Sequence, residues 1–159
     1  MTGRADMLDG VPRRDSGRLL ELKPHFDHHA YLLKYYPGFN PALIESALDA
    51  GARGIVLEGT GLGHVSKHCQ DPIRKALKRD VPVFMTSQTI WGRVDMNVYD
   101  NGRDLLNIGV TPLEDMLPET ALVKLSWILG QARTPDKIRA MMTEPMVGEI
   151  TKRTLAEAA

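Results

Sequence analysis

The sequence lacks several features that would assign its class at once. Its single cysteine, Cys69, excludes an internal disulfide framework and a cysteine-rich zinc site. The 20 Lys and Arg residues balance 20 Asp and Glu residues, which disfavours a general nucleic-acid or membrane-surface binder. No apolar run reaches the roughly 18 residues of a spanning helix, and the first residues lack the apolar core of a signal peptide. We therefore expect a cytoplasmic protein without a membrane partner.

What is present is an ordinary globular composition, with 43% hydrophobic and 25% charged residues among 159. A chain of this length buries about two-thirds of its unfolded surface and can form one core. Residues 1–18 are polar and rich in glycine, which predicts a linker or tail. The domain is expected over residues 19–154, and residues 155–159 are expected to fray.

The order of apolar segments predicts an α/β fold. Strands are expected over residues 29–36, 54–58 and 81–86, with Pro82 near the start of the third. One helix follows Asn40, the expected N-cap, and ends at Gly51; its apolar face is Leu43, Ile44, Ala47 and Leu48. Three strand–loop–helix units predict a parallel sheet. Other helices are expected from near Asp71, a turn or two over 102–109, and over 118–130 and 134–142.

Ligands of a parallel sheet bind beyond the carboxyl ends of its strands. Residues 59–64, here called the glycine loop, leave the second strand as Gly-Thr-Gly-Leu-Gly-His. A phosphate cradle of the dinucleotide type needs G-x-G-x-x-G directly before a helix, which this spacing does not give. A tight packed turn and a loop facing a substrate or another chain both remain open.

Three other features follow at the same edge. Thr86, Ser87 and Gln88 end the third strand, where they either bind a polar substrate or cap the next turn. Ser87 lacks the G-x-S-x-G turn of a nucleophilic serine. His64 and His68 would share a face if a helix held both, but no acidic third ligand is nearby. The polar stretch 91–109 is long for a plain connection, which is typical of functional loops. No complete catalytic set is visible.

Longer runs of sequence resemble a known family. The chain resembles the C-terminal half of type I L-asparaginases, and within them the D subunit of the archaeal glutamyl-tRNA(Gln) amidotransferase. The similarity covers about residues 18–154 and is carried by the runs LELKPHFDHHAYLLKYYPGFNPALIESALDAGARG, GIVLEGTGLGHVS, VPVFMTSQTIWGRVDMNVYDNGRDLLNIGV and EDMLPETALVKLSWILG.

The resemblance implies a small three-layer domain with a short parallel sheet of about four strands flanked by helices. The resemblance also implies that the catalytic residues are missing. In this family the threonine nucleophile, a second threonine and the activating aspartate–lysine pair lie in a larger N-terminal domain, and they have no counterpart here. We therefore expect no catalytic residue, no metal and no cofactor, and no amidase activity from this chain alone.

The family builds its active site between two protomers, so the resemblance also implies binding residues. Related type II enzymes carry a neighbour-contacting polar residue in the glycine loop, and His64 occupies its position with a different side-chain type. The implied substrate-site or neighbour-contacting candidates are Gly61, Gly63, His64, Thr86, Ser87, Gln88 and Tyr99.

The partners implied in the same way are an N-terminal asparaginase domain, a second copy of this chain, and the E subunit of the amidotransferase, through which tRNA is reached. The assembled enzyme would release ammonia from glutamine for Gln-tRNA(Gln) formation, or hydrolyse asparagine. Two alternatives stay open: a stand-alone module that binds a small amino acid or amide, and, ranked last, a nucleotide-binding domain based on the glycine loop.

Overall fold

The computed structural model describes residue 17 and residues 19–152. Most of the predicted linker, and the whole predicted frayed end, lie outside these residues. In chain order the elements are β1 (Ala30–Lys34), α1 (Ala42–Asp49), β2 (Gly54–Gly59), the 3₁₀ helix η1 (Lys67–Cys69), α2 (Gln70–Lys78), β3 (Val83–Ser87), α3 (Asp100–Asn107), β4 (Thr111–Pro112), α4 (Pro118–Gln131) and α5 (Pro135–Thr143).

The four strands form one sheet in the order β1-β2-β3-β4, and every neighbouring pair is parallel. This confirms the predicted fold class. Every residue of β2 and β3 is buried, because helices cover both faces of the sheet. That burial explains why both strands appear in the sequence as continuous apolar runs.

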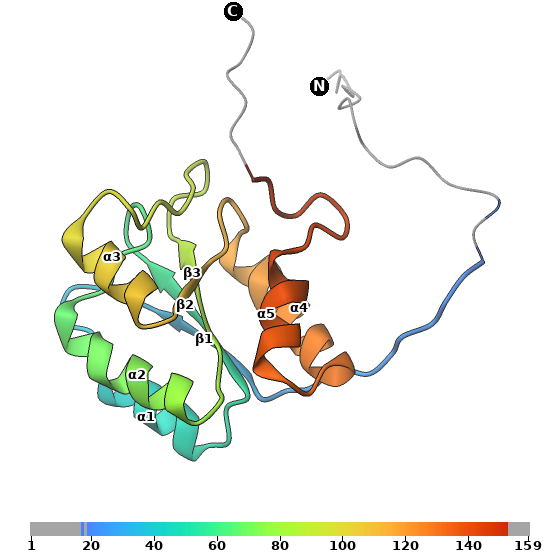
Figure 1. The fold of residues 1–159 in the computed structure, drawn as a ribbon, viewed down its shortest axis with the longest axis horizontal. Helices are drawn as coiled ribbons and strands as arrows, with labels where there is room; N and C mark the ends of the chain where they lie inside the picture. The colour runs from blue at the N-terminus through green and yellow to red at the C-terminus, as the bar shows by residue number, and fades with distance from the viewer. Residues whose placement is uncertain (1–16, 18, 153–159) are drawn as a thin grey trace, which may run out of the picture.

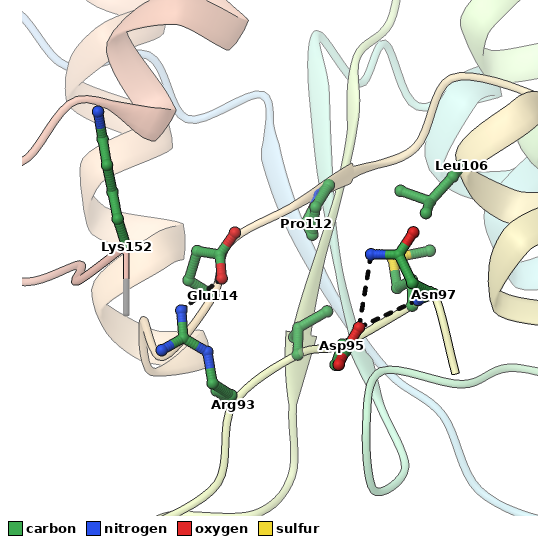
Figure 2. A pocket seen from close by; sticks show the side chains of 9 residues that line it. Arg93, Asp95, Asn97, Leu106, Pro112, Glu114 and Lys152 are labelled. Atoms are coloured by element: carbon green, nitrogen blue, oxygen red, sulfur yellow. Dashed lines mark hydrogen bonds and ion pairs between the residues drawn. The ribbon is translucent and has the colours of Figure 1, made fainter. Parts of the chain in front are cut away.

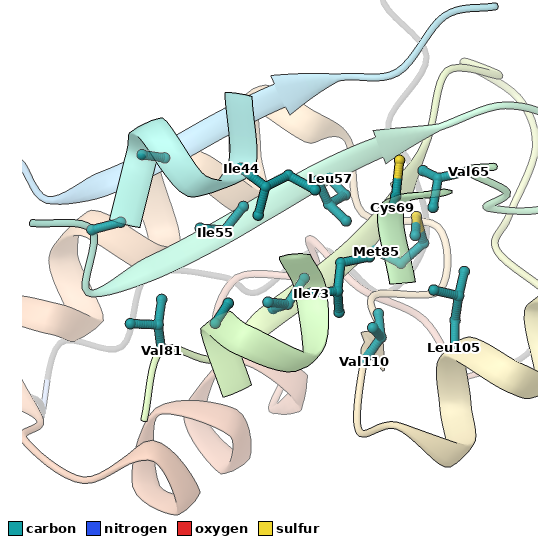
Figure 3. Close-up of a cluster of buried hydrophobic side chains, with 14 of the residues drawn as sticks. Ile44, Ile55, Leu57, Val65, Cys69, Ile73, Val81, Met85, Leu105 and Val110 are labelled. Carbon is teal, nitrogen blue, oxygen red and sulfur yellow. The ribbon is translucent and has the colours of Figure 1, made fainter. Parts of the chain in front are cut away.

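The helices form two outer layers, with α1, α2 and α3 on one face and α4 and α5 on the other (Figure 1). Alternate strand residues serve alternate layers: Ile55 and Leu57 pack towards the first group, whereas Val56 and Phe84 pack towards the second. Figure 3 shows the first of these cores. No helix among the described residues is long and apolar enough to span a bilayer.

The start of α1 follows the sequence rule. The Asn40 side chain accepts a hydrogen bond from the Ala42 backbone N–H at 3.0 Å, so it satisfies a donor at the helix N-terminus as predicted. Gly51 ends the helix with φ at +86°, a conformation that favours glycine. Of the predicted apolar face, Ile44, Ala47 and Leu48 are buried, while Leu43 is 42% exposed.

Several expected boundaries were wrong. The first strand is shorter than 29–36 and excludes His29, which precedes it, although the Tyr35 N–H still bonds the Glu58 carbonyl at 3.0 Å. The second helix, in contrast, begins at Gln70, within one residue of the expected start near Asp71, and the separate turn η1 precedes it. The helical turns expected over 102–109 form the two-turn helix α3, which starts at Asp100.

The segment before β1 is fixed to α4. Asp27 donates its N–H to the Ser126 carbonyl at 2.9 Å, and the Ser126 hydroxyl donates to the Asp27 carbonyl at 2.7 Å. The Trp127 indole donates to the Lys23 carbonyl at 3.0 Å. The chain therefore enters the fold along one helix, with its backbone held from Lys23 onwards.

Candidate functional site

The glycine loop closes as a small hairpin at the carboxyl end of β2. Thr60 N–H donates to the His64 carbonyl at 3.0 Å, and His64 N–H donates to the Thr60 carbonyl at 2.9 Å. Gly63 has φ at +91°, and a Cβ there would lie 2.8 Å from Val94 Cγ1. Gly61 has φ at +51° and faces open space. The loop turns back on itself before α2 begins at Gln70, so it is not placed as a phosphate cradle at a helix N-terminus.

Ser87 fastens the glycine loop to the end of β3. Its hydroxyl bonds the Gly61 carbonyl and the Thr89 hydroxyl, both at 2.5 Å, and accepts the Thr89 N–H at 3.0 Å. The Thr89 hydroxyl also donates to the Gly61 carbonyl at 3.2 Å. Within the described residues, neither hydroxyl is hydrogen-bonded to a lysine, histidine or carboxylate. Ser87 therefore acts as a link between loops and lacks the base that a nucleophile needs.

The side chains of Thr86 and Gln88 also make hydrogen bonds within the fold. The buried Thr86 hydroxyl donates to the Leu57 carbonyl at 3.2 Å. The Gln88 amide donates to the carbonyls of Glu58, at 3.1 Å, and of Tyr35. Both side chains use their donors to join neighbouring strands and do not cap the next turn; among these residues Ser87 bonds the following turn, since it accepts the Thr89 N–H.

His64 and Tyr99 come together at this edge although they are far apart in the sequence. Their rings meet edge-on, with centroids 5.2 Å apart and an interplanar angle of 67°. Among the described residues, His64 Nε2 is the buried side-chain polar atom left without a hydrogen-bond partner. Such an atom costs about 1–3 kcal/mol. Tyr99, whose ring contacts the His64 ring, is 59% exposed.

A cavity of about 390 Å³ is lined in part by residues 93–97, which lie between β3 and α3. Its polar lining consists of Arg93, Asp95, Asn97, Glu114 and Lys152, shown with their neighbours in Figure 2. The Arg93 guanidinium pairs with the Glu114 carboxylate at 2.5 Å, and Asp95 Oδ1 accepts the Asn97 N–H at 3.2 Å.

The cavity wall is joined to the glycine loop, since the Asp95 N–H donates to the Leu62 carbonyl at 3.0 Å. The stretch 91–109 was singled out in the sequence and supplies Arg93, Asp95 and Asn97. Glu114 and Lys152 were missed, because each reaches the cavity from a different element and shares no local motif with it.

No single helix holds both His64 and His68, because His64 closes the glycine loop and His68 lies in η1. The described residues contain no group of three His, Cys, Asp or Glu side chains suited to a metal ion. Burial raises the pKa of the Cys69 thiol, which opposes formation of a reactive thiolate.

The fold matches a known class of protein, the α/β domains of asparaginases. Residues 30–142 match the model of the glutaminase/asparaginase C-terminal domain. The chain belongs to this family.

The curated relatives include the D subunit of the glutamyl-tRNA(Gln) amidotransferase of Sulfurisphaera tokodaii, 55% identical over 149 residues, which are 94% of this chain and 33% of that protein. The corresponding D subunit of Methanothermobacter thermautotrophicus is 50% identical over 148 residues, 93% of this chain and 34% of the relative. The chain thus spans about a third of the length of these relatives.

Two solved asparaginases share the fold. The thermostable L-asparaginase from Thermococcus kodakarensis superposes with a TM-score of 0.80 at 34% identity, covering 92% of this chain and 45% of that one. L-asparaginase I from Vibrio cholerae gives a TM-score of 0.75 at 28% identity, covering 82% and 40%. The chain is therefore an asparaginase C-terminal domain, homologous to the amidotransferase D subunit and to asparaginases.

Proposed function

We propose that this domain completes an amidase active site whose nucleophile lies in another stretch of polypeptide. In this proposal the carboxyl edge of the sheet, with His64 and Tyr99 at its centre, contacts the substrate or the neighbouring site. The reaction is hydrolysis of a side-chain amide, with glutamine as the donor of ammonia for Gln-tRNA(Gln) formation, or asparagine.

The observation that carries this proposal is the unsatisfied His64 Nε2 on a domain of an amidase family. Hydrolysis of an amide needs a nucleophile, a base and an oxyanion site held rigidly together. The hydroxyls at this edge, those of Thr60, Thr86, Ser87 and Thr89, bond to backbone carbonyls or to each other. This domain's contribution is substrate positioning, which can supply several kcal/mol of rate enhancement without a reacting group.

The partners follow from the same proposal. An N-terminal asparaginase domain supplies the reacting groups, and a second copy of this chain lets each site draw on two protomers. The relatives named as the amidotransferase D subunit favour the E subunit as a further partner, which gives indirect access to tRNA. Gly61, Gly63, Thr86, Ser87 and Gln88 then shape the loops around His64 and Tyr99 and do not touch the reacting amide.

The decisive experiment mixes the purified chain with a separately expressed N-terminal half of an archaeal D subunit and measures ammonia released from glutamine and from asparagine. Neither half is expected to release ammonia alone, and the mixture is expected to release it from at least one amide. Circular dichroism of each half shows that it is folded.

Two results would contradict the proposal. One is turnover by this chain alone that disappears in Thr60→Ala, Thr86→Ala or Ser87→Ala, because the nucleophile would then lie within it. The other is no turnover in a mixture of folded halves that form a complex.

A second candidate is a stand-alone module that binds an amino acid or amide without turnover. It is favoured by the cavity beside the glycine loop, whose lining carries both charge signs at Arg93, Glu114 and Lys152. Calorimetry on the isolated chain with glutamine, glutamate, asparagine and aspartate tests it. Heat that disappears in Arg93→Gln supports it, and no heat at millimolar ligand eliminates it.

A further inference from the structure

Residues 19–23, here called the apolar arm, lead up to the point where the Trp127 indole bonds the Lys23 carbonyl. Leu19, Leu20 and Leu22 are 92%, 98% and 80% exposed, which is unusual for adjacent leucines in a folded domain. The backbone groups of Leu20 and Leu22 make no hydrogen bond within the described residues. The arm thus presents both apolar side chains and unused backbone donors and acceptors.

The arm has the alternation of a β-strand. The Lys23 ammonium pairs with the Glu21 carboxylate at 3.1 Å, so these two residues share one side of the extended chain. Leu20 and Leu22 therefore lie on the other side, together with Phe26 further along.

An apolar groove of about 510 Å³ begins where the arm joins the domain. Phe26 is part of its wall, with Val123 and Trp127 of α4 and with Met146 and Val147 of the segment after α5. Val147 is 78% exposed and Val123 is 59% exposed. Phe26 lines the groove and lies three residues beyond the end of the arm. The groove and the leucines of the arm therefore form one continuous apolar stripe.

We propose that this stripe is the contact between two copies of the chain, in which the two arms pair as antiparallel strands about Leu22. In this register Leu22 faces its counterpart, and Glu21 of each copy lies across from Lys23 of the other, which is a favourable cross-strand charge pair. Leu20 of each copy lies across from Pro24 of the other, two residues from Phe26. It therefore reaches the mouth of the partner's groove.

A second copy fits this surface better than an unrelated chain because the stripe carries both halves of the contact. Each arm offers leucines and each groove accepts them. In a dimer with two-fold symmetry, the arm of each copy therefore contacts the groove of the other. The charges of the arm are likewise self-complementary in that register. This inference rests on the proposed function in one respect, the presence of two copies in the assembly. It adds which surface of each copy forms the contact.

Cysteine cross-linking tests the register in the full chain. Leu22→Cys is expected to form a covalent dimer with itself in a glutathione redox buffer, because directly opposed Cβ atoms lie about 4.5–5.5 Å apart, near disulfide range. Glu21→Cys mixed with Lys23→Cys is expected to give the heterodimer. Leu19→Cys is the matched control: it is equally exposed but does not face itself, so it should remain monomeric in the denaturing gel.

A charge at the axis tests the contact without cross-linking. Leu22→Glu is expected to weaken the dimer at least about tenfold in sedimentation velocity, with an unchanged circular dichroism spectrum. Leu43→Glu, which changes an exposed apolar residue of α1 on the opposite face of the sheet from α4 (Figure 1), is the control that should leave the dimer intact.

Three results would overturn the inference: a monomer at all concentrations, a dimer unaffected by Leu22→Glu, or Leu19→Cys cross-linking as readily as Leu22→Cys. The amidase proposal is tested separately by mixing with the N-terminal half. Ammonia release without the Leu22 cross-link would refute this contact alone, and the cross-link without ammonia release would refute the amidase proposal alone.

Discussion

The Lys124 ammonium lies 2.5 Å from a carboxylate oxygen of Glu149, and the two side chains are only 6% and 7% exposed. Lys124 also donates to the carbonyls of Met142 at 3.0 Å and Glu144 at 2.6 Å. The Glu149 carboxylate accepts the Val147 N–H at 2.8 Å. One buried pair therefore holds the end of α5 and the segment after it against α4, and shapes one wall of the apolar groove.

Removing the cation from this pair is expected to be costly. Lys124→Met leaves the Glu149 carboxylate buried without its counter-ion, and we expect the free energy of unfolding to fall by about 3–5 kcal/mol. Urea denaturation followed by circular dichroism measures it. Arg139→Met, which breaks the exposed Arg139–Asp136 pair of 2.8 Å, is the control and should cost less than about 1 kcal/mol. Equal losses for the two variants would mean that burial does not matter here.

The same carboxylate predicts loss of stability in acid. Burial alone raises the pKa of Glu149, but hydrogen bonds from Lys124 and from the backbone N–H groups of Val147 and Met146 outweigh it and lower the pKa from 4.5 to about 2. A pKa lowered by folding stabilises the fold above 4.5, and this contribution is lost as the pH falls from 4.5 towards 2. It amounts to about 3 kcal/mol.

Asp27 is a second carboxylate whose contribution to stability is expected to be lost in acid. Burial raises its pKa, but hydrogen bonds from His29 and Arg53 lower it from 3.8 to about 2. Urea unfolding between about pH 6 and about pH 3 should show a steep loss of stability in the native chain. Glu149→Gln should have a shallower dependence on pH, and an unchanged slope would show that other groups control the acid transition.

The sequence was sufficient for the fold because its signals are local. The apolar runs of β2 and β3, the Asn40 cap and Gly51 each report a nearby backbone requirement, and the structure confirms them. The start of α3 was not visible. Gly102 lies inside that helix because its backbone packs on the Met96 carbonyl, where a Cβ would lie 2.3 Å from the oxygen. A glycine kept for close tertiary contact looks like a turn signal in the sequence.

The candidate site was predictable only in part. The glycine loop and the end of β3 were located correctly at one edge of a parallel sheet, because topology alone determines that placement. The roles of Thr86 and Gln88 were not predictable, since their hydrogen bonds go to carbonyls of neighbouring strands. The approach of Tyr99 to His64 depends on how residues 88–99 return to the glycine loop, for which the sequence carries no periodic signal.

Gly130 should tolerate no side chain. A Cβ there would lie 2.1 Å from the His25 carbonyl oxygen, a backbone atom that cannot rotate away. Gly130→Ala is expected to separate the entering chain from α4 and to lower the free energy of unfolding by about 1–3 kcal/mol. Gly61→Asn is the control, because Gly61 faces open space and asparagine adopts positive φ readily; thermal unfolding of that variant should be close to native. A native melting curve for Gly130→Ala would contradict the close packing of these segments.

His64→Ala tests the centre of the candidate site through its effect on the assembled amidase. In the mixture with an N-terminal half, kcat/KM for ammonia release should fall about tenfold to a hundredfold, because positioning is lost while the reacting groups are intact. The variant should remain as stable as the native chain or more so, since it removes the buried Nε2 that has no partner in the described residues. Val98→Ala, in the exposed loop beside Tyr99, is the matched control and should retain full activity. Full activity in His64→Ala would move the substrate contact elsewhere on this edge, whereas a parallel loss of stability and activity would make His64 a packing residue.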